Sequence, residues 1–196
     1  MKEFVTVMFC FLSFACVAQK ANYADSLQKF QRNYMVTHEV VSKADRKYFR
    51  FFPVDAKFRV LAKVERLHDS TGFIMKTSGP KSKKYFRYAL LKFSLAGKAF
   101  QLTVYQSEDL MSNAEYKDYL FVPFTDLTSG EKSYGGGKYI DLLLGDIKED
   151  KVVLDFNKAY NPYCAYTTGY NCPIPPREND LPVAIYAGEM NFAKSH

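Results

Sequence analysis

The sequence predicts a mainly β protein: an antiparallel β-barrel or sandwich of about seven to ten short strands, with an N-terminal amphipathic helix. Three observations support this fold class. From residue 51 onward, apolar residues alternate with polar ones instead of recurring at helical spacing. Glycine and proline residues separate the alternating runs at distances typical of hairpins. Helical spacing is confined to residues 23–41, and no internal repeat or heptad pattern occurs.

The helical segment places Leu27, Phe30 and Tyr34 on one face, which is the spacing of an amphipathic helix. Asp25 or Ser26 stands where a side chain can cap the first turn. We therefore expect one helix within an N-terminal helical segment of residues 19–50.

A β-rich domain is expected over residues 51–196. Its first strand alternates four apolar side chains with charged ones, as a strand with one buried face does. A short turn at Gly97 joins two later strands, and Pro123 ends another. The expected strands are residues 57–67, 72–78, 84–95, 99–107, 114–124, 139–144, 151–156 and 181–189.

The first 18 residues are predicted to be a secretory signal peptide. Lys2 precedes an apolar run over residues 4–17 that is too short to span a bilayer, and Ala18 offers a small residue for cleavage. A lipid anchor on Cys16 is the alternative. No later segment is long and apolar enough to cross a membrane, so we expect no transmembrane segment and a secreted or periplasmic protein.

Composition and charge exclude several functional classes. A chain of 196 residues with 47% hydrophobic and 16% aromatic residues is not disordered. Residues 71–107 carry seven Lys or Arg and no acid. This is typical either of a solvated hairpin or of a surface that attracts anions such as lipid headgroups, cell-surface polymers or a phosphorylated ligand. We expect no nucleic-acid partner, because the formal net charge is only +6 and no such motif occurs.

Common catalytic and metal motifs are not matched. The stretch "YGGGKY" at residues 134–139 lacks the GxxxxGK[ST] spacing of a phosphate loop, so it predicts a turn with positive φ. Its backbone amides, with Lys138 beside them, could still bind an oxyanion. The three histidines, His38, His68 and His196, fit no metal spacing, and no GxSxG occurs. We therefore predict no metal site and no cofactor.

The segment "DFNKAYNPYCAYTTGYNCPIPPREN", residues 155–179, shows neither helical nor strand periodicity. Its prolines stiffen it, and its tyrosines give it apolar mass. Its side chains can hydrogen-bond to backbone amides that no strand ladder satisfies, chiefly those of Asp155, Asn157, Asn161 and Asn179. In an oxidising compartment, Cys164 and Cys172 form a disulfide that closes a small loop. This predicts a rigid loop over one end of the barrel, either as scaffold only or as scaffold and binding site.

Four stretches, "TSGEKSYGGGKYIDL", "LDFNKAYNPYCAY", "YNCPIPPREN" and "LPVAIYAGE", together resemble the DUF1684 family of bacterial and archaeal proteins of unknown function. The resemblance runs from about residue 51 to residue 189. Because some relatives lack export signals, it also leaves open reduced thiols, or a metal held by the two cysteines. It implies that the family signature includes Tyr139, Asp141, Asp155, Asn157, Tyr160, Asn161, Cys164, Cys172, Asn179 and Glu189.

Three functional hypotheses follow. The first is an exported domain that binds a small polar or anionic molecule at the loop of residues 155–179, using the aromatic and amide groups usual in pockets. The second is a hydrolase or transferase using Asp155 and Glu189, or Asp141, with Cys164 as nucleophile if it is reduced. The third is a purely structural envelope protein. Oligomeric state is not predicted. The candidate ligand-binding residues are Lys138, Tyr139, Asp141, Asp155, Asn157, Tyr160, Asn161, Tyr166, Asn179 and Glu189.

Overall fold

The alternating segments build one eight-stranded sheet in a computed structural model, which describes residues 22–194. Neighbouring strands follow the order β6-β5-β4-β3-β1-β7, with β2 paired to β3 and β8 paired to β5. The pairs are antiparallel except for β5 and β8. The strands are β1 Arg59–Arg66, β2 Phe73–Met75, β3 Lys83–Leu95, β4 Lys98–Ser107, β5 Tyr119–Asp126, β6 Lys138–Leu143, β7 Lys151–Asp155 and β8 Asp180–Leu181.

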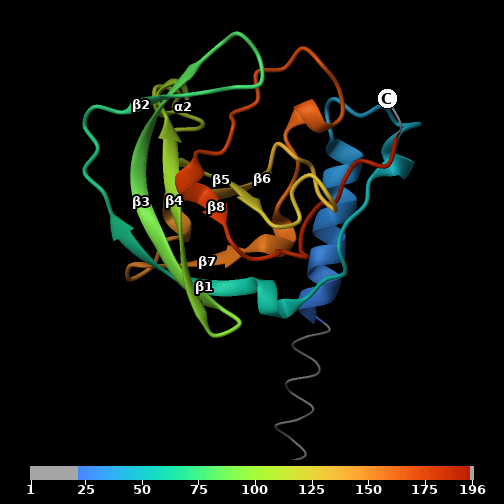
Figure 1. Ribbon diagram of the computed structural model, residues 1–196, viewed down its shortest axis with the longest axis horizontal. Helices are drawn as coiled ribbons and strands as arrows, with labels where there is room; N and C mark the ends of the chain where they lie inside the picture. The colour runs from blue at the N-terminus through green and yellow to red at the C-terminus, as the bar shows by residue number, and fades with distance from the viewer. Residues whose placement is uncertain (1–21, 195–196) are drawn as a thin grey trace, which may run out of the picture. The chain divides into compact units, whose positions relative to one another are not determined.

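The sheet curls into a half-barrel, in which β1 and β7 run crosswise to β3 and β4 (Figure 1). The predicted mainly β, antiparallel fold is therefore confirmed. Of the two predicted architectures, the sheet forms an open barrel and not a sandwich. The predicted turn at Gly97 is also present. Ala96 and Gly97 both adopt positive φ, 50° and 76°, and they join β3 to β4 in a two-residue hairpin loop.

A bulge in β3 gives the sheet two different apolar faces. The register between β3 and β4 shifts between Arg87 and Ala89. Because side chains alternate with a period of two, this shift exchanges the faces on either side of it. Residues Ala89 and Leu91 thus join the main core inside the half-barrel, whereas Tyr85 packs on the opposite face with Tyr105.

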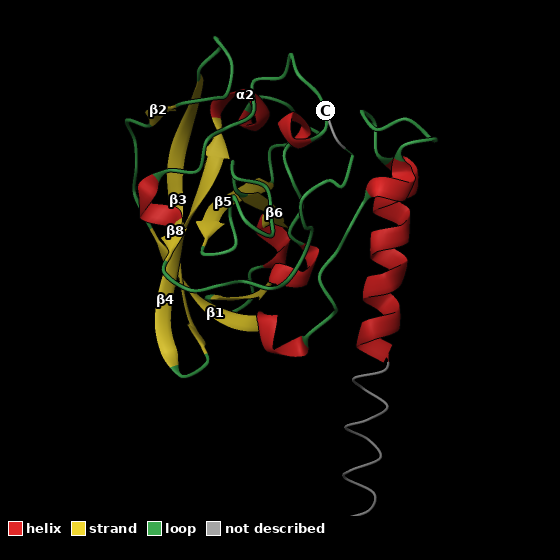
Figure 2. Cartoon of the chain, turned by 45° about the vertical axis from the view of Figure 1, so that its right-hand side comes forward, coloured by secondary structure: helices red, strands yellow, loops and turns green. Residues whose placement is uncertain are grey.

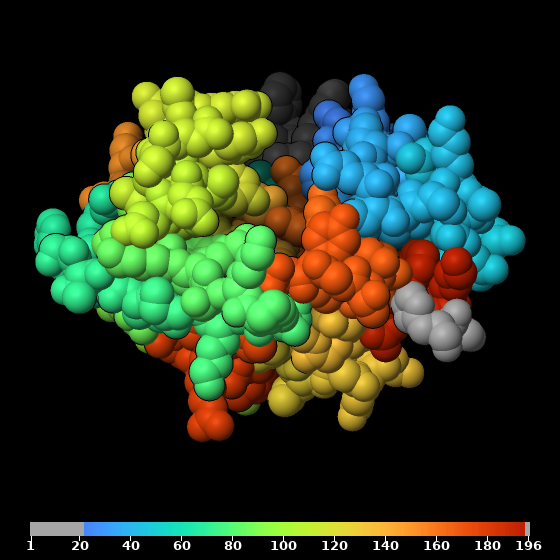
Figure 3. Space-filling model, turned by 90° about the horizontal axis from the view of Figure 1, so that it is seen from above, coloured from blue at the N-terminus to red at the C-terminus, as the bar shows by residue number. Residues whose placement is uncertain are grey.

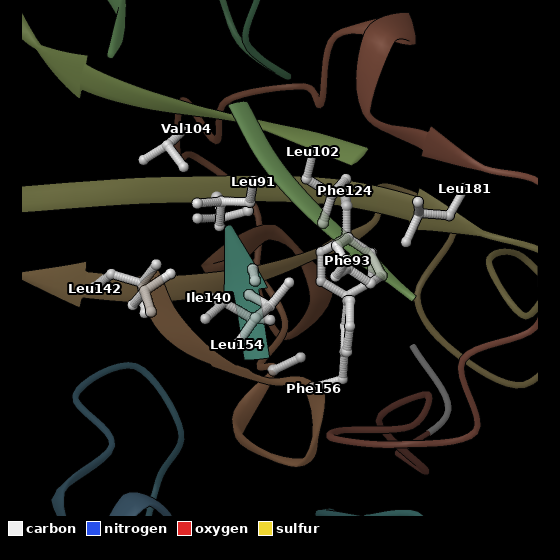
Figure 4. Packing of buried hydrophobic residues seen from close by; sticks show 14 of the residues in the cluster. Leu91, Phe93, Leu102, Val104, Phe124, Ile140, Leu142, Leu154, Phe156 and Leu181 are labelled. Atoms are coloured by element: carbon white, nitrogen blue, oxygen red, sulfur yellow. The ribbon is translucent and has the colours of Figure 1, made fainter. Parts of the chain in front are cut away.

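The main core fills the concave side of the sheet (Figure 4). Phe156 contacts Phe93 and Phe124 there, with ring centroids 5.6 and 5.3 Å apart. Leu181 is also buried in this cluster. The chain after β7 is therefore part of the core, although it is mostly loop and short 3-10 turns (Figure 2). The short helices are η1 Arg46–Tyr48, η2 Ala56–Phe58, α2 Glu108–Met111, η3 Leu144–Asp146, η4 Phe156–Lys158, η5 Tyr163–Ala165 and η6 Arg177–Asn179.

Residues 22–37 form the expected N-terminal helix, which ends four residues earlier than the apolar spacing suggested. The chain divides into two compact units, one ending at His38 and the other beginning at Glu39. The predicted signal peptide and the alternative anchor on Cys16 lie outside the described residues, so export, cleavage and the proposed domain limits stay predictions. Within residues 22–194, no helix combines the length and apolar character needed to cross a bilayer.

Candidate functional site

The side chain of Asn179 replaces backbone pairing that β4 and β5 lack. The ladder between these strands is limited to the pair Tyr105 and Phe121, and Pro123 has no N–H to donate. Thr103 N donates to Asn179 Oδ1 at 2.7 Å. In return, Asn179 Nδ2 donates to the carbonyls of Thr103 and Pro123, at 2.9 and 2.7 Å. This fully buried carboxamide therefore bridges two strands.

Asn157 binds backbone in the same way. Its Oδ1 accepts from Asp55 N at 3.0 Å and its Nδ2 donates to Asp55 O at 2.9 Å. Asp155 Oδ1 accepts from both the backbone and the side-chain nitrogen of Asn157, each at 3.1 Å. The expectation that these side chains satisfy backbone groups is therefore confirmed. The bonds between Asn157 and Asp55 also tie the loop to the segment before β1.

Glu189 forms a second buried junction. Its carboxylate is fully buried and accepts from Tyr166 OH at 2.6 and 2.7 Å and from Asn161 N at 2.9 Å. Asn161 Nδ2 donates to Met190 O at 2.8 Å. Gly188 permits this arrangement: it has a φ of 76°, and a Cβ there would lie 2.5 Å from Ala159 O. These groups hold the loop to the C-terminal segment.

Lys138 lies on the core side of β6, not at the surface of the glycine loop. Its ammonium group is fully buried, 3.3 Å from Asp126 Oδ2, and it donates to the carbonyls of Ile185 and Ala187 at 3.2 Å. Burial lowers the pKa of Lys138, and the charge of Asp126 opposes that shift. The positive φ predicted for the loop is found at Gly137, at 85°.

A disulfide joins Cys164 to Cys172, with a Cα–Cα distance of 6.3 Å. Ser78 lies against this bridge: Cys172 N donates to Ser78 Oγ at 3.1 Å, and Ser78 N donates to Cys172 O at 2.9 Å. Lys81 N donates to Asn171 Oδ1 at 3.0 Å. The bridge therefore also holds the basic segment before β3 against the loop, a connection between two regions that the sequence showed only separately.

These contacts border an open cavity of about 570 Å³, the tyrosine cavity, on the face of the sheet opposite the main core. Figure 3 shows a hollow between the green segment near residue 80, the yellow-green segment near residue 110 and the orange segment near residue 170. Residues 169–173 form one wall, and Lys81 and Lys83 also line the cavity. Its aromatic lining comprises Tyr85, Tyr119, Phe121, Tyr139, Tyr160, Tyr163 and Tyr170.

Most of the cavity tyrosines are held in place by hydrogen bonds or ring contacts. Tyr139 OH donates to Pro173 O, and its ring lies edge-on to that of Phe121, with centroids 4.7 Å apart. Tyr163 OH donates to Glu39 at 3.0 Å, and the ring of Tyr163 lies edge-on to that of Tyr170. The cavity therefore presents ordered aromatic edges and faces.

The carboxylate of Asp141 contacts the cavity tyrosines. Tyr160 OH donates to both oxygens of Asp141, at 2.7 and 2.8 Å, and Tyr119 also bonds to Asp141. Burial of the Asp141 carboxylate raises its pKa, and the two phenols oppose that shift. Part of the residue remains solvent-exposed. Burial, followed by the charge of Asp141, raises the pKa of both Tyr119 and Tyr160. These phenols are therefore neutral donors at neutral pH.

The predicted candidate residues therefore do not form one site but lie in separate regions of the structure. Tyr139 and Tyr160 line the tyrosine cavity, and Asp141 is bonded to Tyr160. Asp141 and Asp155 border a smaller pocket of about 300 Å³ that also includes Arg59 and Lys158. The other candidates line neither pocket and are buried in hydrogen-bonded junctions: Lys138, Asn157, Asn161, Tyr166, Asn179 and Glu189.

Several cavity residues were not among the predicted ones. Tyr85, Tyr119 and Phe121 come from strands far from the loop in sequence, and Lys81 and Lys83 were noted only for charge. The available signal was the presence of aromatic residues on β3 and β5, on the face opposite the main core. The alternation was obscured by the bulge in β3. Within residues 22–194, no group of three or more His, Cys, Asp or Glu is placed to hold a metal ion.

Fold and site together define a half-barrel domain whose cross-linked loop forms one wall of an open aromatic cavity. The family model "Protein of unknown function (DUF1684)" matches residues 46–190, and the chain belongs to this family. It is similar to an uncharacterized protein of Haloarcula marismortui solved by solution NMR. That match has 30% identity and a TM-score of 0.65, and it covers 88% of this chain and 96% of the other. No curated protein matches.

Proposed function

We propose that this domain is an exported binding protein for a small anionic molecule with a planar ring, held in the tyrosine cavity. The observation that supports it is the cavity lining, with six tyrosines, one phenylalanine and two lysines around about 570 Å³. Ligand pockets combine mostly apolar or aromatic walls with a few polar groups. Tyrosine faces suit a planar ring, and the ammonium groups of Lys81 and Lys83 suit a carboxylate, sulfonate or phosphate.

The construction of the loop supports binding rather than turnover. Glu189 is fully buried under Tyr166, and the sulfur atoms of Cys164 and Cys172 are joined to each other. A substrate could reach Glu189 only after Tyr166 moved. A rigid wall, in contrast, lowers the conformational cost of holding a small ligand.

The test is calorimetric titration with naphthalene-2-carboxylate and its neutral counterpart, naphthalene-2-carboxamide. We expect the carboxylate to bind more tightly than the amide. Tyr170→Ala should remove one aromatic wall, and Lys81→Gln with Lys83→Gln should remove the anion preference. Each should weaken carboxylate binding about tenfold, which corresponds to about 1.4 kcal/mol.

Tyr116→Ala is the matched control, because Tyr116 is 43% exposed and does not line the cavity. It should leave binding unchanged. The proposal is wrong if the folded protein binds neither compound, or if the cavity variants bind the carboxylate as well as Tyr116→Ala does.

A further inference from the structure

A second concave region lies where β1 and β3 separate. These strands pair from Lys63 with Lys92 to Arg66 with Ala89. Before Lys63, β1 pairs only with β7, and after Lys92, β3 pairs only with β4. A groove of about 900 Å³ occupies this opening. It shares no lining residue with the tyrosine cavity.

The inner part of this groove is apolar. It is lined by Val60, Phe93, Phe100 and Leu181. The ring centroids of Phe93 and Phe100 are 6.1 Å apart. Leu61, also in the lining, is 61% exposed on the outer face of β1. Phe93 and Leu181 are only 5% and 4% exposed, so the accessible hydrocarbon is mainly that of Val60, Leu61 and Phe100. Covering it gains about 25 cal/mol per Å² of apolar surface. The groove therefore favours an apolar occupant.

Three lysines stand side by side at its border. Lys63 is the register partner of Lys92 on one side and of Lys151 on the other, and all three line the groove. Directly opposed residues have Cβ atoms about 4.5–5.5 Å apart, and like charges at this distance destabilise a sheet. The arrangement therefore carries an internal cost that a bound anion would relieve.

Local carboxylates neutralise this row only at Lys92. Lys92 Nζ lies 2.7 Å from Glu65, which also feels the charge of Lys63. In the part of the chain that the structure describes, neither Lys63 nor Lys151 forms an ion pair. Of the two acids in the groove, Glu178 accepts from Arg87 and Tyr105 at 2.8 and 2.9 Å, and Asp180 accepts from Thr125.

We infer that this groove binds the anion of a fatty acid, with its carboxylate on Lys63 and Lys151 and its aliphatic chain along Val60, Leu61 and Phe100. A single-chain carboxylate satisfies both observations at once, because it brings one negative charge to the lysine row and hydrocarbon to the apolar wall. A hydrophilic anion would leave the apolar wall hydrated, and a neutral alcohol would leave the lysines opposed.

The test is calorimetric titration of the full chain with decanoate below its micellar range, alongside acetate and 1-decanol. Decanoate should bind at least tenfold more tightly than either. Lys63→Gln with Lys151→Gln should weaken decanoate binding at least tenfold. The melting temperature of this variant without ligand should stay equal or rise, because two opposed like charges have been removed.

Lys43→Gln with Lys117→Gln is the matched control for net charge, since both lysines are exposed and neither lines the groove. It should bind decanoate normally, as should Tyr170→Ala, which separates this site from the tyrosine cavity. Amide shifts on decanoate addition should centre on Val60 and Phe93 rather than on Tyr139. Equal loss in both lysine variants, shifts centred on Tyr139, or binding only to phosphatidylglycerol vesicles would each overturn the inference.

Discussion

Single side chains perform much of the work that strand ladders perform in a regular barrel. The carboxamides of Asn157, Asn161 and Asn179 each bond backbone groups of a segment distant in sequence. A carboxamide carries a donor and an acceptor in nearly the geometry of a peptide group. It can therefore satisfy buried backbone groups at places where proline or an irregular chain interrupts pairing.

Asn179→Ala should lower the free energy of unfolding by about 2–4 kcal/mol, because it leaves the buried N–H of Thr103 and two carbonyls without partners. Urea unfolding followed by circular dichroism measures this. Asn113→Ala is the control, since the Asn113 side chain accepts from Glu115 N at 2.9 Å in an exposed loop. Equal losses in the two variants would contradict the role assigned to Asn179.

At the scale of elements, η6 is fastened to the sheet by a charged contact. Arg87 on β3 donates to both oxygens of Glu178, at 2.8 and 3.3 Å, and Tyr105 on β4 donates at 2.9 Å. The hydrogen bond from Arg87 is the main cause that lowers the pKa of Glu178 below its ordinary 4.5. The contact therefore links the end of the loop to two strands, and its ionic part is present only while Glu178 is ionised.

This pKa shift gives a stability that depends on pH. Because the folded pKa lies below the unfolded one, the contribution is present above about pH 4.5 and is lost as pH falls through the folded pKa. The side chains are 36% and 38% exposed, so screening limits it to about 1 kcal/mol. Urea midpoints at pH 7 and pH 3 should show Glu178→Gln less stable than the parent at pH 7, and by a smaller margin at pH 3. An equal difference at both pH values would contradict this.

The disulfide joins Cys164 in η5 to Cys172, which lies eight residues later in the sequence, and so closes a small loop. Chain entropy predicts about 2–3 kcal/mol of stabilisation for a loop of this size. Cys164→Ser with Cys172→Ser should lower the free energy of unfolding by this amount and weaken binding in the tyrosine cavity, because residues 169–173 form its wall. Alkylation of the unreduced protein, followed by intact mass measurement, should modify neither cysteine. Two modified thiols would contradict the cross-link.

For the whole molecule, local sequence pattern located most strands but not the site. Two strand predictions were wrong: β5 continues past Pro123 to Asp126, and β8 covers only Asp180–Leu181 instead of residues 181–189. Alternation located β1, and Gly97 located the β3–β4 hairpin, because both signals lie within one segment. The bulge at residues 87–89 has no such signal, and it decides which face Tyr85 occupies. The role of Asn179 depends on the missing β4–β5 pairs, which only the tertiary structure reveals. Residue type alone therefore did not show which side chains stabilise the fold and which line the cavity.

At this scale, the cross-link is expected to depend on export. Disulfides persist in oxidising compartments, whereas cytosolic thiols are kept reduced. We therefore expect the full chain, expressed in a bacterial host, to reach the periplasm, begin at Gln19 and carry an intact Cys164–Cys172 bridge. A chain lacking residues 2–18 should stay in the cytosol with both thiols reduced.

Fractionation, N-terminal sequencing and intact mass measure this outcome. Cys16→Ser tests the alternative anchor: it should change nothing if cleavage follows Ala18, but should release the protein from the membrane fraction if a lipid is attached to Cys16. Signal peptides combine a charged start, an apolar run and a small residue at the cleavage site, and residues 1–18 provide all three. Recovery of the full-length chain from the cytosol, with residues 1–18 retained, would show that the segment does not direct export, and the bridge would then need an oxidant other than the compartment.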